Sequence, residues 1–77
     1  MNEKPYNGWK NHATWNVALY IQNDYMLYKL ALLCNSYTQW LKASEGMRGA
    51  FTPDGINWHD PRISRSEITE MLRELHE

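Results

Sequence analysis

The pattern of apolar and polar positions predicts a long helix over residues 25–44. Two apolar stripes run along this stretch at the i, i+3, i+4, i+7 spacing of a helix, and together they cover a wide arc. Asp24 is placed to cap the helix, and Asn35-Ser36 is a weak point at which we expect it to kink or split. The first stripe is Leu27, Leu30, Ala31, Cys34, Tyr37 or Thr38, and Leu41, and the second is Met26, Leu33, Tyr37 and Trp40.

Two shorter helices are predicted on either side of it. Over residues 65–76 one apolar stripe follows a capping box, Ser64 with Glu67 three positions later. Residues 12–22 are ambiguous, because their apolar positions fit both a helix that starts after Asn11 and the alternation of a half-buried strand. We favour the helix. The alternative is an α+β fold in which residues 14–22 form a strand that pairs with residues 56–58.

The remaining segments are predicted to be irregular but ordered. Residues 1–10 form an N-terminal arm with a turn at Tyr6-Asn7-Gly8-Trp9, and Thr52-Pro53-Asp54-Gly55 predicts a packed turn or short hairpin within residues 47–63. We expect Trp9 to bury its ring against the long helix, near Leu33, Tyr37 or Trp40, so that Trp9→Ala would unfold the protein. The alternative is that the arm is a binding element, in which case Trp9→Ala would fold with an unchanged melting temperature and lose its partner. The prediction is thus a mostly α, three-helix domain spanning residues 1–77.

Composition narrows the functional classes. Eight Lys and Arg against nine Asp and Glu give a net charge of −1, so no overall field draws the chain to DNA or to an anionic membrane. No apolar run is as long as a membrane span and the first residues do not resemble a signal peptide, which predicts a cytoplasmic protein with no membrane partner. A core this small rarely supplies more than ~3–5 kcal/mol, so most of the ten aromatic rings should be buried, and a homodimer is an alternative source of stability.

The residues that could carry chemistry do not form a catalytic pattern. Cys34, the one cysteine, lies on an apolar stripe where a thiol behaves as a small hydrophobe, and a single cysteine excludes an internal disulfide. The three histidines, His12, His59 and His76, do not pair at zinc-ligand spacing. We therefore expect neither an enzyme nor a bound metal or cofactor.

The aromatic residues suggest a binding protein instead, because there are more rings than the helical stripes can bury. Trp and Tyr are frequent anchors of protein interfaces, and acidic residues on the exposed side of the last helix could meet a basic partner. The candidate partner-binding residues are Tyr6, Trp9, Tyr20, Trp58, Glu70 and Glu74. A second hypothesis is a single-stranded nucleic-acid binder that uses Tyr6, Trp9, Lys4 and Lys10, but it is disfavoured because the basic residues are few and diluted by acids.

Residues 6–24 are the most distinctive sequence segment of the chain. They resemble small uncharacterised proteins of phages and bacteria, including cyanobacteria and their phages, that share a YNGWxNxxTWxVxLxIxND segment; residues 52–58 and 70–75 are similar as well. The resemblance brings no catalytic or binding residues with it, but it implies a phage setting, in which small proteins often inhibit or modulate host proteins. We therefore expect a non-enzymatic module that binds a host protein in the bacterial cytoplasm and modulates or inhibits it. The inhibited host protein could belong to a defence system.

Overall fold

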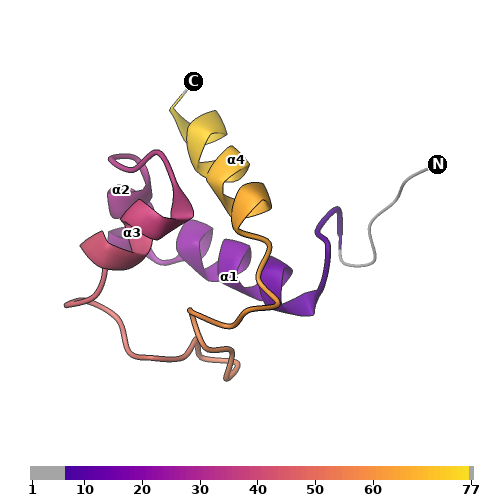
Figure 1. Ribbon diagram of the computed structural model, residues 1–77. Coiled ribbons are helices and arrows are strands. Elements are labelled where there is room, and N and C mark those ends of the chain that lie inside the picture. The colour runs from indigo at the N-terminus through magenta and orange to yellow at the C-terminus, as the bar shows by residue number, and fades with distance from the viewer. Residues whose placement is uncertain (1–6, 77) are drawn as a thin grey trace.

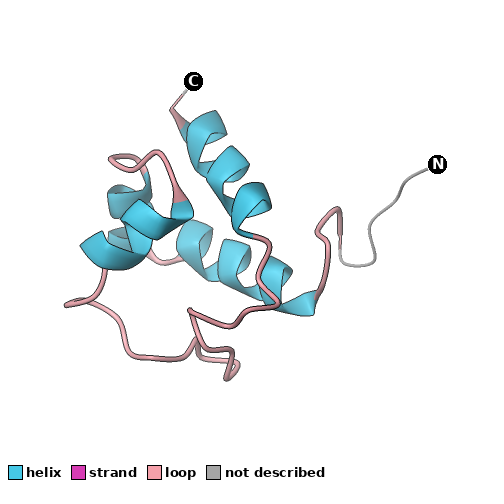
Figure 2. Ribbon diagram, in the orientation of Figure 1, coloured by secondary structure: helices cyan, strands magenta, loops and turns pink. Residues whose placement is uncertain are grey.

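A computed structural model describes residues 7–76, which form four helices and no β-sheet (Figures 1 and 2). The helices are α1 (His12–Asn23), α2 (Tyr25–Ala31), α3 (Tyr37–Ala43) and α4 (Arg65–Leu75). The mostly α fold is confirmed, with helices close to the predicted 12–22 and 65–76. The alternative that makes residues 14–22 a strand is wrong, because α1 occupies them.

Each helix begins at a side chain that accepts a hydrogen bond from a backbone N–H in its first turn. These bonds satisfy donors that have no partner within the helix itself. Asp24 has two roles, since its own N–H donates to the Tyr20 carbonyl at the end of α1 while its carboxylate caps α2. The capping residues are Asn11, Asp24, Ser36 and Ser64.

The predicted helix over residues 25–44 is two helices, α2 and α3, separated by residues 32–36. The break falls at Asn35-Ser36, the predicted weak point. Nearby polar side chains accept hydrogen bonds from the backbone there, which competes with the bonds that would continue the helix. The Ser36 hydroxyl accepts from the Gln39 N–H at 3.1 Å, and the Asn35 N–H donates to Gln39 Oε1 at 2.8 Å. The break separates the second stripe: Tyr37 is buried in the core, whereas Leu33 is 75% exposed.

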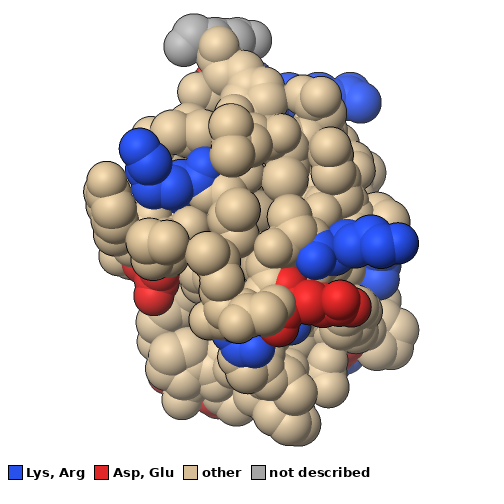
Figure 3. Space-filling view, turned by 90° about the vertical axis from the view of Figure 1, so that its left-hand side faces the viewer, with Lys and Arg blue, Asp and Glu red and all other residues tan. Residues whose placement is uncertain are grey.

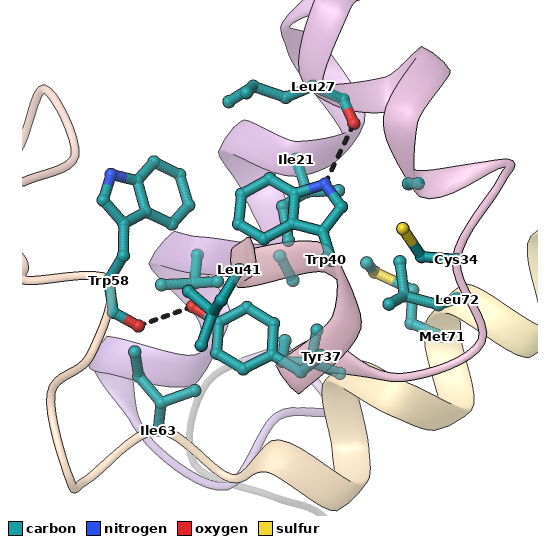
Figure 4. Close-up of a cluster of buried hydrophobic side chains, with 14 of the residues drawn as sticks. Ile21, Leu27, Cys34, Tyr37, Trp40, Leu41, Trp58, Ile63, Met71 and Leu72 are labelled. Carbon is teal, nitrogen blue, oxygen red and sulfur yellow. Dashed lines mark hydrogen bonds between the residues drawn. The ribbon is translucent and has the colours of Figure 1, made fainter. Parts of the chain in front are cut away.

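An aromatic cluster lies at the centre of the core (Figure 4). Trp40 stacks on Tyr37 with ring centroids 5.8 Å apart and meets Trp58 in a tilted arrangement at 5.3 Å. The polar atoms of two rings are satisfied: Trp40 Nε1 donates to the Leu27 carbonyl at 3.2 Å, and the Tyr37 hydroxyl donates to the Trp58 carbonyl at 2.7 Å. This cluster joins α2, α3 and the connection between α3 and α4.

The predicted turn around Thr52 is a short hairpin with an antiparallel bridge between Phe51 and Asn57. Gly55 has a φ of 92°, which favours glycine, and the Thr52 N–H donates to the Ile56 carbonyl at 2.7 Å. Buried Asn16 of α1 anchors the hairpin: its amide nitrogen donates to Asp54 Oδ2 and its amide oxygen accepts from the Thr52 hydroxyl, both at 2.7 Å.

A second pair of side chains at the start of α1 holds the end of the same connection. Asn11 Nδ2 donates to the Arg62 carbonyl at 2.7 Å, and the Thr14 hydroxyl accepts from the Ser64 N–H at 2.8 Å. Thr14 in turn donates to the Asn11 amide oxygen at 2.8 Å. Three polar residues of the distinctive segment, Asn11, Thr14 and Asn16, are therefore structural, because they fix residues 51–64 to α1.

We expect Asn16→Leu to lower the free energy of unfolding by about 1–3 kcal/mol, because the buried Thr52 hydroxyl and the Asp54 carboxylate lose their amide partner. Urea unfolding followed by tryptophan fluorescence measures the change. Asn23→Ala, at an exposed position of the same helix, is the control and should change the free energy by less than about 0.5 kcal/mol. Equal stability of the two variants would contradict the anchoring role of Asn16.

The stability of the protein should depend on pH through Asp60. The Asp60 carboxylate accepts hydrogen bonds from the Arg62 side chain at 2.7 and 3.0 Å and from the Arg62 backbone N–H at 2.8 Å. These bonds lower the pKa of Asp60 to about 2. Since the folded pKa is below the unfolded one of about 3.9, the stabilisation is complete above pH ~4 and is lost as the pH falls towards 2. Thermal unfolding at a series of pH values measures this. The melting temperature should fall less steeply towards acid pH for Asp60→Asn than for the control Glu74→Gln. Identical declines would show that the Asp60–Arg62 pair does not stabilise the protein.

Candidate functional site

The exposed large apolar residues gather around α2. Among the described residues, these side chains occur in α2, in the turn after it and in the loop that follows α3. Such clustering matters because isolated exposed hydrophobics are common on any protein, whereas contiguous ones mark interaction surfaces. The residues are Tyr25 (70% exposed), Met26 (50%), Leu33 (75%), Met47 (50%) and Phe51 (58%).

The shortness of α2 explains why this face is uncovered. Within its seven residues only Leu27 and Ala31 are buried, on the side that faces the core. Met26, Leu30 and Leu33 follow at i, i+4 and i+7 and form a second row, of which Leu30 is half-buried against the core. Met26 is 50% exposed and Leu33 is 75% exposed, so α2 and the turn after it present apolar side chains to solvent.

This row lines a hollow of about 340 Å³, which we call the α2 surface. Figure 3 views the side formed by α2, α3 and the following loop. Most of this side is uncharged, and it carries several basic and acidic groups, some of which lie side by side. Lys29 is the charged residue of the lining, and its Nζ lies 5.7 Å from the centre of the Tyr25 ring. The α2 surface consists of Met26, Lys29, Leu30, Leu32, Leu33 and Met47.

Three of the predicted partner-binding residues meet at a different place, between α4 and the end of the arm. Trp9, Glu70 and Glu74 line a hollow of about 300 Å³ together with Gln22 of α1 and Met71 of α4. Glu70 and Glu74 are exposed, as predicted, and Trp9 is half-buried.

The position predicted for the Trp9 ring is wrong. It contacts the α1–α4 side of the core instead of Leu33, Tyr37 or Trp40. The local geometry explains this, because the turn at Asn7 and Gly8 has positive φ angles of 50° and 93°, and the Lys10 N–H donates to Glu67 Oε1 at 2.9 Å. The arm is thereby directed to α4.

Trp58 is not an exposed anchor, which corrects the prediction for this residue. Its side chain is only 2% exposed because the hairpin places the ring against Trp40. Tyr20 is half-buried beside the same hairpin, and burial followed by the nearby Asp54 carboxylate raises the pKa of its hydroxyl. Tyr6, with Lys4, lies outside the described residues.

Groups that could act as nucleophile or metal ligand lie apart from one another. Cys34 is buried, and burial raises the pKa of its thiol, so the reactive thiolate is suppressed. Within residues 7–76 no group of three or more His, Cys, Asp or Glu residues is placed to hold a metal ion. The helices of this part of the chain include none that is long and apolar enough to cross a membrane.

Comparison with known proteins gives a family but no activity. The model of a family of unknown function, DUF7249, matches residues 1–77, and the chain belongs to this family. No curated protein and no solved structure matches the chain.

The sequence does not single out the α2 surface, because its residues share their helical spacing with buried ones. Met26 and Leu33 belong to the same stripe as Tyr37 and Trp40, and only the break between α2 and α3 separates exposed from buried members. The one available signal is Asn35-Ser36, the predicted weak point. Had the helix been divided there, Met26, Leu30 and Leu33 would have formed a separate short stripe.

The half-buried position of Trp9 revises the effect expected of Trp9→Ala. We expect the variant to fold and to lose about 1–2 kcal/mol of its free energy of unfolding, since a half-buried ring contributes less than the ~3–5 kcal/mol of a buried one. Trp40→Ala, at a fully buried position, is the comparison and should leave the chain unfolded. Circular dichroism and urea titration distinguish the two; an unfolded Trp9→Ala protein would contradict this interpretation.

Proposed function

We propose that the protein is a non-enzymatic protein-binding module and that its partner binds at the α2 surface. The observation that carries the proposal is the contiguous exposure of Met26, Leu33 and Met47 around one hollow. Methionine and leucine side chains adapt to a partner with little strain, and methionine is over-represented on binding surfaces. A domain with so few core residues gains nothing in stability from leaving these side chains in water.

The chemistry of the hollow indicates what kind of segment binds there. Its lining is apolar except for Lys29, and none of the lining residues is acidic. A complementary segment is therefore an apolar face of another protein, such as one side of an amphipathic helix, that places an Asp or Glu beside Lys29. Lys29 would contribute to orientation and association rate, and the apolar contacts would contribute most of the affinity.

The biological setting is also a proposal. The resemblance of the distinctive segment to phage and bacterial proteins supports a phage-encoded protein that acts in the cytoplasm of a bacterial host. In that setting the bound segment would belong to a host protein, whose activity is modulated or inhibited when the module covers its surface. Anti-defence activity is one form of such inhibition.

Two other functions are weighed against this one. A homodimer would use the same apolar surface, but two copies would bring the Lys29 residues of both chains into one interface without an acidic residue of that surface to offset them. Nucleic-acid binding is disfavoured because Trp9 lies in a hollow lined by Glu67, Glu70 and Glu74, whose carboxylates repel phosphate. One of these carboxylates, that of Glu67, accepts the backbone N–H of Lys10.

The proposal is tested by comparing variants of the immobilised full chain in bacterial lysates. Met26→Glu combined with Leu33→Glu should reduce the amount of a stoichiometric partner at least about tenfold, because two carboxylates would enter the apolar contact. Both positions are exposed, so the melting temperature should stay close to that of the wild type. Lys29→Glu should weaken the same interaction more at low salt than at high salt.

The matched control is Glu70→Gln with Glu74→Gln, on the opposite hollow, which should retain the partner in full. Retention of the same partner by the double-glutamate variant would show that the α2 surface is not the site. Sedimentation of the protein alone should give a monomer. A dimer that the double-glutamate variant abolishes would replace the proposed partner by a second copy.

A further inference from the structure

The indole of Trp58 carries a buried hydrogen-bond donor that has no acceptor. Trp58 is 2% exposed. Among the described residues, its Nε1 is the buried side-chain nitrogen that has no hydrogen-bond partner in the protein. The neighbouring indole is different, since Trp40 Nε1 donates to the Leu27 carbonyl at 3.2 Å. Leaving a buried donor unpaired lowers the stability of the folded state, and a small domain has little stability to spare. Such a donor needs an explanation.

The same residue lines a pocket of about 260 Å³ between the start of α2 and the loop after α3. Figure 4 shows that the ring nitrogen of Trp58 points away from Trp40 and from the rest of the cluster. Buried Leu27 lines the inner part of the pocket with Trp58, and exposed Met47 and Phe51 line its outer part. The pocket is several times larger than the ~30 Å³ that one water occupies in the liquid, so it is wide enough for a small organic group.

The charges of the pocket select the type of acceptor. Arg48 is held in place as a wall, because its Nε donates to Ser44 Oγ at 2.7 Å and its Nη2 to the Leu41 carbonyl at 2.9 Å. Its guanidinium lies 5.7 Å from the ring centre of Trp58. The lining also contains Asp24, whose negative charge cancels the positive charge of Arg48, so the pocket has no net formal charge. A carboxylate would find no net positive charge, whereas a neutral carbonyl needs none.

We propose that this pocket binds a small apolar molecule that carries an uncharged carbonyl group. The Trp58 Nε1–H donates to the carbonyl oxygen, and the apolar part of the ligand contacts Leu27, Met47 and Phe51. A buried donor of this kind discriminates strongly, because a ligand without an acceptor leaves the donor unpaired. The site adjoins the α2 surface at Met47 but does not depend on a partner there.

Two-dimensional NMR of the ¹⁵N-labelled full chain tests the site directly, since each indole N–H gives its own signal. N-benzylacetamide, which has a ring and a neutral carbonyl, should shift the Trp58 indole signal saturably and slow its exchange with water. The Trp40 indole signal is the internal control and should stay in place because its donor is already paired. Phenylacetate and toluene, which replace the carbonyl by a carboxylate or remove it, should bind more weakly.

Variants separate this site from the α2 surface. Phe51→Ala should weaken N-benzylacetamide binding by about tenfold, through loss of ring contact, without changing the melting temperature, because Phe51 is exposed. Met26→Glu combined with Leu33→Glu should leave the affinity for N-benzylacetamide unchanged, because neither residue lines this pocket, although the same variant is expected to weaken partner binding at the α2 surface. The proposal is overturned if the Trp58 signal does not respond, if toluene or phenylacetate binds as well as the amide, or if the indole N–H shows a cross-peak to a long-lived water.

Discussion

The fold depends on hydrogen bonds from three side chains of the first helix and its cap to the connection between α3 and α4. Residues 44–64 contain no helix and no sheet, yet the backbone polar groups that they bury need partners. Asn11, Thr14 and Asn16 provide contacts at both ends of the hairpin segment. With the hairpin fixed in this way, Trp58 is placed against Trp40 and the core is closed on that side. In this chain, which has no disulfide, a loop therefore covers one side of the core.

Closing the core with a loop has a consequence for the surface. In α3, Tyr37 and Trp40 are fully buried, whereas α2 buries only Leu27 and Ala31, on one side. On the other side of α2, Leu30 packs partly against the core, but Met26 and Leu33 are 50% and 75% exposed and contribute little to it. Their presence is explained better by a contact outside the chain than by the fold, and this separates them from the rings that the fold requires.

Local chemistry made most of the fold predictable. The capping residues Asn11, Asp24 and Ser64 stand at the predicted helix starts, because an N-cap needs only a short polar side chain and a nearby backbone N–H. The location of the surfaces was not predictable, because burial depends on contacts between segments far apart in sequence. Trp58 was expected to be an exposed anchor and is in the core, and Leu33 was expected in the core and is exposed. Their side chains are equally apolar, so no local pattern distinguishes them.

The described surfaces also differ in what they contribute to stability. The residues that line the α2 surface and the mouth of the neighbouring pocket are mostly exposed, whereas Leu27 and Trp58 at the base of that pocket are buried and structural. Changes at the rim can therefore alter binding while the core remains intact. The exception is the Trp58 indole, which serves the core with its ring and leaves its N–H without a partner. A phenylalanine would fill much of the same space without a buried donor, so the N–H is a feature that packing alone does not explain.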